Sequence, residues 1–137
     1  MKNDIINVVG GLIIQEGKIL ICQRRLGDPH SLKWEFPGGK IQVKETAKDA
    51  LQREIKEELD IVITRYKFIY DYIYEYKKLS KKVHLYFYLI TQFKNLIKNN
   101  IHKKIKWVKV NELSKFDFIE GDNQILIKLY NNDFKIY

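Results

Sequence analysis

The sequence predicts one α+β domain, built as an α/β/α sandwich with a β-sheet between helices. Three observations predict this fold class. Two β-rich runs precede a strongly amphipathic helix, two longer β-rich runs follow it, and a second amphipathic segment comes near the end. The 137 residues contain no linker, repeat or low-complexity stretch that would divide them. We therefore expect a single domain over residues 1–137 with a core of its own.

The composition is that of a globular protein without membrane spans. Hydrophobic residues make up 45% of the chain, and no apolar run approaches the length that crosses a bilayer. Cys22, the single cysteine, lies in an apolar run and has no internal partner, which is typical of an inert buried thiol in a reducing cytosol. We expect a cytoplasmic protein with no membrane partner.

The formal net charge of +8 would attract polyanions, either nucleotides or nucleic acid. The excess is mostly lysine and is spread along the chain rather than concentrated in an arginine-rich arm. A biased overall composition explains such a spread at least as well as a nucleic-acid role. We therefore expect no stable nucleic-acid partner.

The N-terminal part has the pattern of a β-hairpin. Residues 5–14 and 18–24 are β-rich and are joined by a Gln-Glu-Gly turn. Asn7 interrupts the first run, and no small-residue cleavage site follows it, so a strand is favoured over a signal sequence. A loop is expected over residues 26–33.

The segment Trp34-Glu35-Phe36-Pro37-Gly38-Gly39 should have an irregular backbone, because proline fixes one dihedral angle and glycine frees both. A helix should follow it. Thr46 with Asp49 three residues later fits a capping signature, which predicts a helix from about Thr46 to Leu59.

This helix carries glutamates where a soluble helix should be apolar. At about 100° per residue, one arc holds the apolar side chains of Ala47, Ala50, Leu51, Ile55 and Leu59. Glu54 and Glu58 fall inside that arc, and Glu57 lies at its edge. Carboxylates on a core-facing stripe are costly unless a cation meets them. A solvated face already exists on the far side of the helix, so the cluster predicts a divalent-metal site.

The second half of the chain should complete the sheet. Residues 61–76 and 82–92 are rich in Ile, Val, Tyr and Phe and predict two long antiparallel strands with a polar break between them. We interpret their aromatic residues as packing rather than as a base-stacking platform. A short strand at 106–110 and a helical turn at 111–116 should precede a closing helix over 122–130, with Ile125, Leu126 and Leu129 inward.

The glutamate-rich segment resembles the signature of the Nudix hydrolase family. That signature is Gly, five residues, Glu, seven residues, then Arg-Glu-apolar-x-Glu-Glu-x-Gly-apolar. The corresponding positions are Gly39, Glu45, Arg53, Glu54, Ile55, Glu57, Glu58, Asp60 and Ile61, and eight of the nine match across 23 residues. The preceding Trp-Glu-Phe-Pro-Gly-Gly-Lys-Ile resembles the MutT-type branch, the nucleotide-pool sanitising pyrophosphohydrolases. The resemblance implies a Nudix fold with a mixed β-sheet between helices.

The chemistry of phosphoanhydride hydrolysis fits these residue types. It needs neutralisation of charge on phosphoryl oxygens and a positioned water, and Mg²⁺ prefers a few carboxylates with phosphates and waters. Glu54, Glu57 and Glu58, at i, i+3 and i+4, project from one side of the helix, where Arg53 can hold Glu57.

The family resemblance assigns roles. It implies Glu54 as a general base or metal ligand, and Glu57, Glu58 and the Gly38 carbonyl as metal ligands. Glu45 would be a supporting acid paired with Arg53. The implied cofactor is Mg²⁺, with Mn²⁺ as a possible substitute.

On the substrate side, the resemblance implies nucleotide contacts from Arg25, His30, Glu35, Phe36 and Asp122. An acid reads a purine edge while an aromatic ring packs on the base, and Lys40 could meet a phosphate. Three of these residues also fit purely structural roles: His30 in a turn, Phe36 in the core, and Asp122 as a helix N-cap. Asn123 would read the base if the alignment shifted by one residue.

Two positions depart from the family pattern. Asp60 replaces a glycine that would end the helix in a left-handed conformation, which aspartate tolerates better than most residues. Relatives also often carry Glu-His shortly before a Trp, whereas here Ile101-His102 precedes Trp107 and the acid is gone. Either the helix glutamates suffice or another acid, such as Glu120, approaches the site.

The leading functional hypothesis is therefore a Mg²⁺-dependent pyrophosphohydrolase that converts a nucleoside triphosphate to the monophosphate and pyrophosphate. The favoured substrate is an oxidised purine nucleotide such as 8-oxo-dGTP, and the enzyme would be a monomer or homodimer. Alternatives are a Nudix enzyme for CTP, a dinucleoside polyphosphate or an RNA 5′ end, and a catalytically weak nucleic-acid-binding module. The signature recognises phosphates and metal, so it does not distinguish the enzymes.

Overall fold

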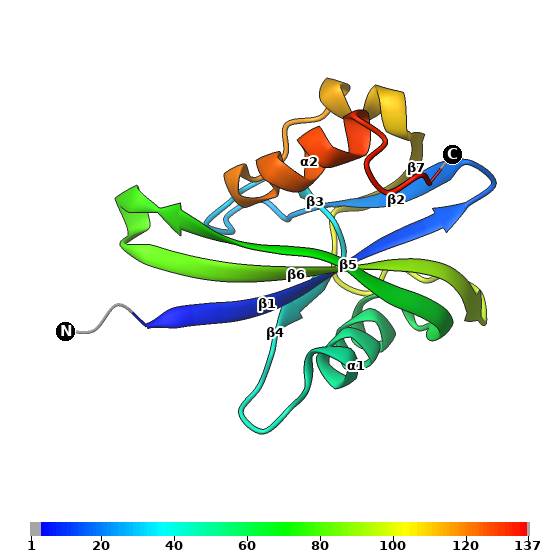
Figure 1. The fold of residues 1–137 in the computed structure, drawn as a ribbon, viewed down its shortest axis with the longest axis horizontal. Coiled ribbons are helices and arrows are strands. Elements are labelled where there is room, and N and C mark those ends of the chain that lie inside the picture. Colours follow the sequence, from blue (N-terminus) through cyan, green and yellow to red (C-terminus); the bar gives the residue numbers. More distant parts are fainter. Residues whose placement is uncertain (1–3, 137) are drawn as a thin grey trace.

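The computed structural model describes residues 4–136 and confirms the α/β/α sandwich (Figure 1). The strands are β1 (Ile5–Gln15), β2 (Lys18–Gln23), β3 (Trp34–Glu35), β4 (Gly38–Lys40), β5 (Val62–Tyr76), β6 (Lys81–Lys94) and β7 (Lys104–Lys109). The helices are α1 (Ala47–Leu59) and α2 (Asn123–Tyr130), with short 3₁₀ turns η1 (Lys77–Leu79), η2 (Val110–Lys115) and η3 (Glu120–Asp122). None of the helices in this part of the chain is long and apolar enough to cross a membrane.

The sheet is mixed, as expected, and follows the order β3-β2-β1-β6-β5. β1 runs parallel to β6 over nine residue pairs, and β6 runs antiparallel to β5 along almost its whole length. β4 adds to β1, and β7 adds to β2. The parallel pair brings the N-terminal strand into the middle of the sheet, next to a strand more than 70 residues later.

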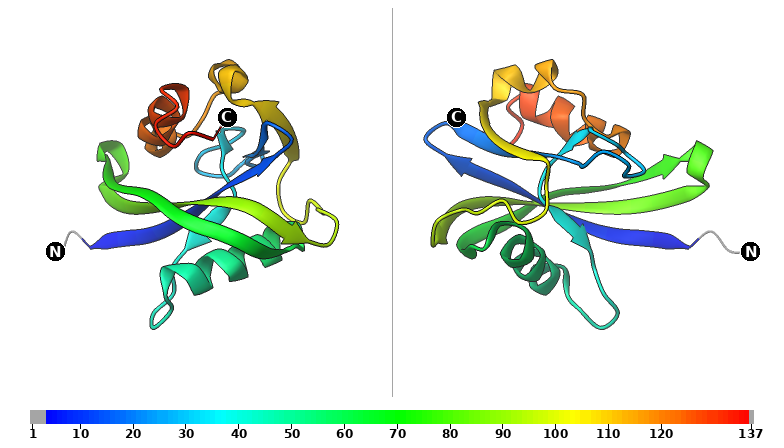
Figure 2. Two further views of the ribbon diagram at one scale, coloured as in Figure 1. Left: turned by 45° about the vertical axis from the view of Figure 1, so that its right-hand side comes forward. Right: turned by 180° about the vertical axis from the view of Figure 1, so that it is seen from behind.

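Two hydrophobic layers cover the two faces of the sheet. α1 packs its apolar stripe, which includes Leu51 and Ile55, against Val9, Ile13 and Ile90 on one face. α2 packs Ile125 and Leu129 on the opposite face. Figures 1 and 2 show the two helices on opposite sides of the strands. Leu126 is only partly buried, so two of the three expected inward positions of α2 are fully covered.

Residues 34–39 differ from the prediction of an irregular segment. They form two short strands, β3 and β4, on either side of Pro37. β3 pairs with β2, and β4 pairs with β1, so the proline lies where the chain passes from one strand partner to the other. A Cβ at Gly38 would lie 2.0 Å from the Val9 carbonyl oxygen, and its φ of +152° also requires glycine.

Both predicted ends of α1 are confirmed. The Thr46 side chain accepts a hydrogen bond from the Asp49 amide at 3.1 Å, which caps the first turn. Asp60 ends the helix in the left-handed conformation (φ 59°, ψ 31°), and its amide donates to the Lys56 carbonyl at 2.9 Å. Asp60 therefore has the conformation of the glycine it replaces, and its carboxylate pairs with Lys56 at 2.8 Å.

Candidate active site

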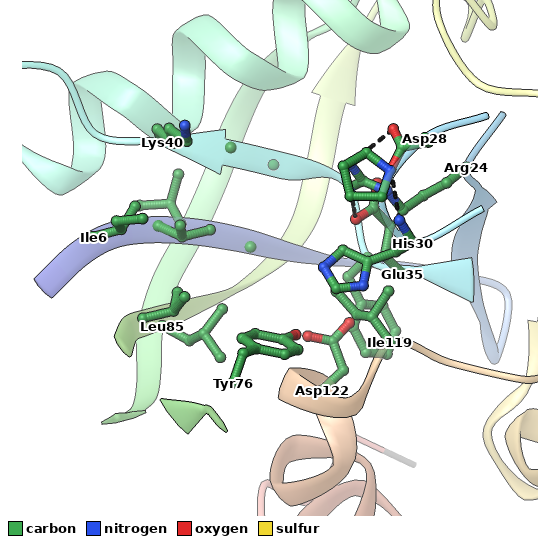
Figure 3. A pocket seen from close by; sticks show the side chains of 18 of the residues that line it. Ile6, Arg24, Asp28, His30, Glu35, Lys40, Tyr76, Leu85, Ile119 and Asp122 are labelled. Carbon is green, nitrogen blue, oxygen red and sulfur yellow. Dashed lines mark hydrogen bonds and ion pairs between the residues drawn. The ribbon is translucent and has the colours of Figure 1, made fainter. Parts of the chain in front are cut away.

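A cavity of about 530 Å³ opens between β1, β4, β6, the loop after β2 and η3 (Figure 3). Its lining includes eight residues predicted from the sequence: Arg25, His30, Glu35, Phe36, Gly38, Lys40, Glu58 and Asp122. The other four, Glu45, Arg53, Glu54 and Glu57, lie on α1 or just before it and are not in the lining. The fold therefore gathers segments that are far apart in the sequence around one hollow, with the acidic helix at its edge.

Arg53 ties α1 to the loop that precedes it. Its guanidinium donates to both oxygens of Glu45, at 2.7 and 2.9 Å, and to Glu54 at 2.7 Å. It also donates to the Lys40 carbonyl at 3.0 Å. The hydrogen bond from Arg53 lowers the pKa of Glu45 to about 2. The expected pairing of Glu45 with Arg53 is confirmed.

Glu58 is a buried carboxyl group in an acidic surrounding. It is 5% exposed, and its Oε1 accepts the Gly38 amide at 3.3 Å. Burial, the negative charge of Glu35 and a hydrogen bond with Glu54 together raise the pKa of Glu58 to about 9. The surroundings of Glu58 therefore favour its protonated form or the approach of a cation.

The donor set at this edge fits a hard divalent cation. Two hydrogen-bonded carboxyl groups, one of them desolvated, stand beside the backbone of Gly38 and Gly39. A Cβ at Gly39 would lie 2.3 Å from Glu54 Oε1, so glycine lets the loop backbone approach this carboxylate. The Glu57 side chain is more than half exposed and lies 3.5 Å from Arg53. Within residues 4–136, no three acidic, His or Cys side chains already form a group that could hold a metal.

A second polar cluster surrounds Glu35 in the cavity lining. Arg24 donates to Glu35 at 2.8 Å and to both oxygens of Asp28, at 2.7 and 2.9 Å. These bonds fix Glu35 beside the cavity. The His30 amide donates to Asp28, so Asp28 caps this turn, while the His30 ring lies 5.2 Å from the Tyr76 ring. His30 therefore contributes a ring to the cavity wall.

Phe36 serves both the core and the cavity. It is buried and packs on Phe118 and Phe87, with ring centroids 5.2 and 6.3 Å apart. It also contributes to the cavity lining. The core position of Phe36 is thus confirmed, and its exposed edge forms part of the cavity wall.

Asp122 is the most deeply buried acid of the cavity lining. It is 3% exposed, its side chain makes no capping bond to α2, and the Phe36 amide donates to it. Burial, followed by the charge of Glu35, raises its pKa well above the usual range of an aspartate. Asn123 is exposed and does not line the cavity. Asp122, and not its neighbour, faces the site.

Arg24 and His102 are among the lining residues that were not predicted as site residues. Arg24 holds Glu35, as described above. His102 is 4% exposed, and its Nε2 lies 3.4 Å from Glu35 and 3.8 Å from Glu58, so it lies between these two acids. Asn99 fixes the backbone of His102 with two hydrogen bonds of 2.9 Å. The Ile-His pair before Trp107 was the available signal for His102, whereas Arg24 had none that separated it from Arg25.

The acid missing at Ile101 is not replaced by Glu120. Ile101 lines the cavity mouth, and its carbonyl accepts a hydrogen bond from Arg25 at 2.6 Å. Glu120 is exposed, accepts a bond from the Tyr74 hydroxyl at 2.8 Å and lies outside the lining. Neither position 101 nor Glu120 therefore adds an acid to the α1 glutamates.

Comparison with known proteins agrees with this geometry. The family model described as the NUDIX domain matches residues 5–129. The chain belongs to the NUDIX family. The match makes it a Nudix hydrolase, a class of enzymes that generally need a divalent metal ion. The acidic edge of the cavity is the part of the site formed by the residues of the Nudix signature.

This Nudix hydrolase has bacterial relatives along most of its length. It is 36% identical over 120 residues to an 8-oxo-dGTP diphosphatase of Buchnera aphidicola (subsp. Schizaphis graminum), covering 88% of this chain and 89% of the relative. It is 29% identical over 121 residues to a CTP pyrophosphohydrolase of Escherichia coli K12, covering 88% of each. Among solved structures, a MutT protein from work on Aliivibrio salmonicida and Vibrio cholerae superimposes with a TM-score of 0.80 at 25% identity, covering 94% of this chain and 99% of that chain.

Proposed function

We propose that this chain hydrolyses a nucleoside triphosphate to the monophosphate and pyrophosphate, and that its favoured substrate is an oxidised purine nucleotide such as 8-oxo-dGTP. The proposal is supported above all by the two kinds of acidic group that the cavity brings together. An acidic helix edge suited to a cation and phosphates lies at one end, and the buried acid Asp122 lies at the other. The name of the Buchnera relative supports the same substrate.

At the acidic end, Glu54, Glu57, Glu58 and the Gly38 carbonyl would hold Mg²⁺, for which Mn²⁺ could substitute. The bound ion supplies neutralisation of charge on the phosphoryl oxygens. Glu57 is free to turn from Arg53, because it is exposed and its contact of 3.5 Å is long. Glu54 would accept the proton of the attacking water, since Arg53 holds its carboxylate in place. Glu45 fixes Arg53 in turn.

On the side of the cavity away from α1, Asp122 would contact the base together with Glu35. Because its pKa is raised, Asp122 keeps its proton to higher pH than an exposed aspartate, and a protonated carboxyl both donates and accepts hydrogen bonds. That combination suits a purine edge. The His30 and Tyr76 rings would pack beside the base. Arg25 and Lys40, exposed at the cavity, would meet the phosphates.

CTP is the second candidate substrate, and the E. coli relative named a CTP pyrophosphohydrolase favours it. The acidic edge would act in the same way on either nucleotide, because it addresses only the phosphates. In either case we propose a cytoplasmic monomer or homodimer without a stable nucleic-acid partner.

A nucleotide panel tests the proposal. The rate of pyrophosphate release with Mg²⁺ should be highest for 8-oxo-dGTP, lower for dGTP and lowest for CTP. If kcat/KM is highest for CTP, then CTP and not 8-oxo-dGTP is the favoured substrate. Absence of Mg²⁺-dependent release from any of the three would reject both.

A further inference from the structure

Four tyrosines alternate along β5 in the sequence Tyr70-Asp71-Tyr72-Ile73-Tyr74-Glu75-Tyr76. This spacing places their rings on one face of the strand, the face that α2 covers. Every one of the four hydroxyls makes a hydrogen bond to the segment 120–125, which carries Asp122. The four tyrosines therefore do more than pack on the sheet, because all of their hydroxyls bind the same segment.

Two members of this tyrosine row, Tyr70 and Tyr74, bond only to side chains of the segment. Tyr70 accepts a bond from Gln124 at 2.7 Å, and Tyr74 donates to Glu120 at 2.8 Å. Both of these bonds are exposed. They hold the surface of the segment and not its backbone.

Tyr72 and Tyr76 instead hold the peptide groups on both sides of one residue. The Tyr72 hydroxyl donates to the Gly121 carbonyl at 2.5 Å, and the Gly121 amide donates to the Tyr76 hydroxyl at 2.8 Å. The Ile125 amide adds a bond to Tyr72 at 3.4 Å. We call Tyr72 and Tyr76 the tyrosine clamp. A Cβ at Gly121 would lie 2.4 Å from the Tyr76 hydroxyl oxygen, so only a residue without a side chain fits at this position.

Both hydroxyls of the clamp are fixed in their surroundings. Tyr72 is buried and its ring stacks on Phe87, with centroids 6.0 Å apart. The Tyr76 ring contacts His30 across the cavity, and Figure 3 shows Tyr76 beside Asp122. Burial raises the pKa of Tyr76 to about 12, so the hydroxyl stays protonated in any ordinary buffer.

We infer that Tyr72 and Tyr76 are positioning residues that set base specificity by fixing the Gly121–Asp122 backbone. Asp122 has no capping bond of its own to hold it, and its carboxyl is held from the protein side by the Phe36 amide. The place of that carboxyl in the cavity therefore depends on the peptide before it, which the two hydroxyls fix. This inference rests on the proposed role of Asp122 in contacting the base.

Removal of single hydroxyls tests the clamp. Tyr72→Phe and Tyr76→Phe keep the rings, whereas Tyr70→Phe and Tyr74→Phe are matched controls from the same strand that lose only exposed bonds. In the two clamp variants the preference for 8-oxo-dGTP over dGTP, as a ratio of kcat/KM, should fall about tenfold, because each loses a buried or partly buried hydrogen bond. The fall should come from KM for 8-oxo-dGTP, with kcat within about twofold. The controls should keep the wild-type ratio.

The opposite result would overturn the inference. A wild-type ratio in both clamp variants, or an equal fall in all four variants, would show that the hydroxyls do not position Asp122. A fall in kcat for both nucleotides with the ratio unchanged would show a general structural role. Gly121→Ala, which drives a methyl group against Tyr76, should lower the ratio as the clamp variants do.

Binding without turnover separates this inference from the proposed function. Calorimetry gives dissociation constants for 8-oxo-dGMP, dGMP, AMP, UMP and CMP. If wild type prefers CMP, the oxidised-purine assignment fails, yet loss of that preference in Tyr72→Phe and Tyr76→Phe would still support the clamp. A wild type that binds all five bases equally would overturn the clamp itself. Failure of pyrophosphate release with base preference intact would reject only the proposed function.

Discussion

Two glutamates of this site, Glu45 and Glu58, have pKa shifts of opposite sign, and this difference indicates different roles. Glu45 has a pKa lowered to about 2, because Arg53 donates to both of its oxygens. Glu58 has a pKa raised to about 9 by burial and by its acidic neighbours. The first is a fixed counter-charge for the arginine. The second is a carboxyl group in a surrounding that favours a proton or a cation.

The substitution Glu54→Gln tests the proposed role of Glu54 as the general base. The amide keeps the shape and can still accept a bond from Arg53, but it does not take up a proton at neutral pH. We expect kcat to fall about 10²- to 10⁴-fold, with little change in Tm. Steady-state pyrophosphate release measures kcat, and a thermal melt measures Tm. Glu75→Gln, on the exposed face of β5, is the control. A rate within threefold of wild type would remove Glu54 from the chemistry.

Asp122 should make stability depend on pH. Its pKa is raised by folding, so its favourable contribution is present below its unfolded pKa of about 3.9 and is lost as pH rises through its folded pKa. In Asp122→Asn the side chain does not ionise, so this loss of stability does not occur. The asparagine oxygen can still accept the hydrogen bond from the Phe36 amide. The variant should be more stable than wild type at pH 8, by about 1–3 kcal/mol, and this advantage should shrink towards pH 4.

Urea unfolding of both proteins between pH 4 and pH 9 measures the difference. The charged groups that face Asp122, Glu35 and Arg24, are present in both, so their effects largely cancel in the difference. Glu58 titrates in both proteins too. A stability difference that stays constant over this range would show that Asp122 does not titrate as its burial requires.

At the scale of elements, α1 was predictable because local rules govern it. Its cap at Thr46, its apolar stripe and its left-handed end at Asp60 each depend on residues within one turn. The segment 34–39 was predicted less well, because pairing with two different partner strands overrode the local tendency of proline and glycine towards irregular backbone. The tyrosines of β5 were expected to pack, and their hydrogen bonds to η3 and α2 depend on tertiary contacts that no local pattern contains.

The junction of α1 with its preceding loop depends on one side chain. Arg53→Gln removes the paired bonds to Glu45 and leaves α1 without its tie to the Lys40 carbonyl. Because such supporting contacts orient metal ligands, we expect the Mg²⁺ concentration for half-maximal activity to rise about 10- to 100-fold. A Mg²⁺ titration of initial rates measures it. Lys56→Gln, on the same helix but paired with Asp60, should leave this Mg²⁺ concentration unchanged. An equal rise in Lys56→Gln would refute a specific role for Arg53.

At the scale of the whole molecule, the sandwich makes a site from segments that the sequence keeps apart. β4 and α1 supply the acidic edge, and the loop after β2, β3 and η3 supply further parts of the lining. The signature spacing predicted that the first group lies close together, because its residues lie on one helix and the loop before it. His102 and Arg24 were not predicted as site residues, since their roles arise from contacts with Glu35 and Glu58. The exclusion of Glu120 likewise required the packing of η3 against β5.

We propose that one cavity joins a metal-dependent phosphoanhydride site to a pocket for a purine base. Product analysis of 8-oxo-dGTP hydrolysis, with and without Mg²⁺, tests it most directly. We predict one pyrophosphate for each 8-oxo-dGMP formed, with turnover only when Mg²⁺ is present. Release of orthophosphate with 8-oxo-dGDP, or no turnover with Mg²⁺ present, would contradict it.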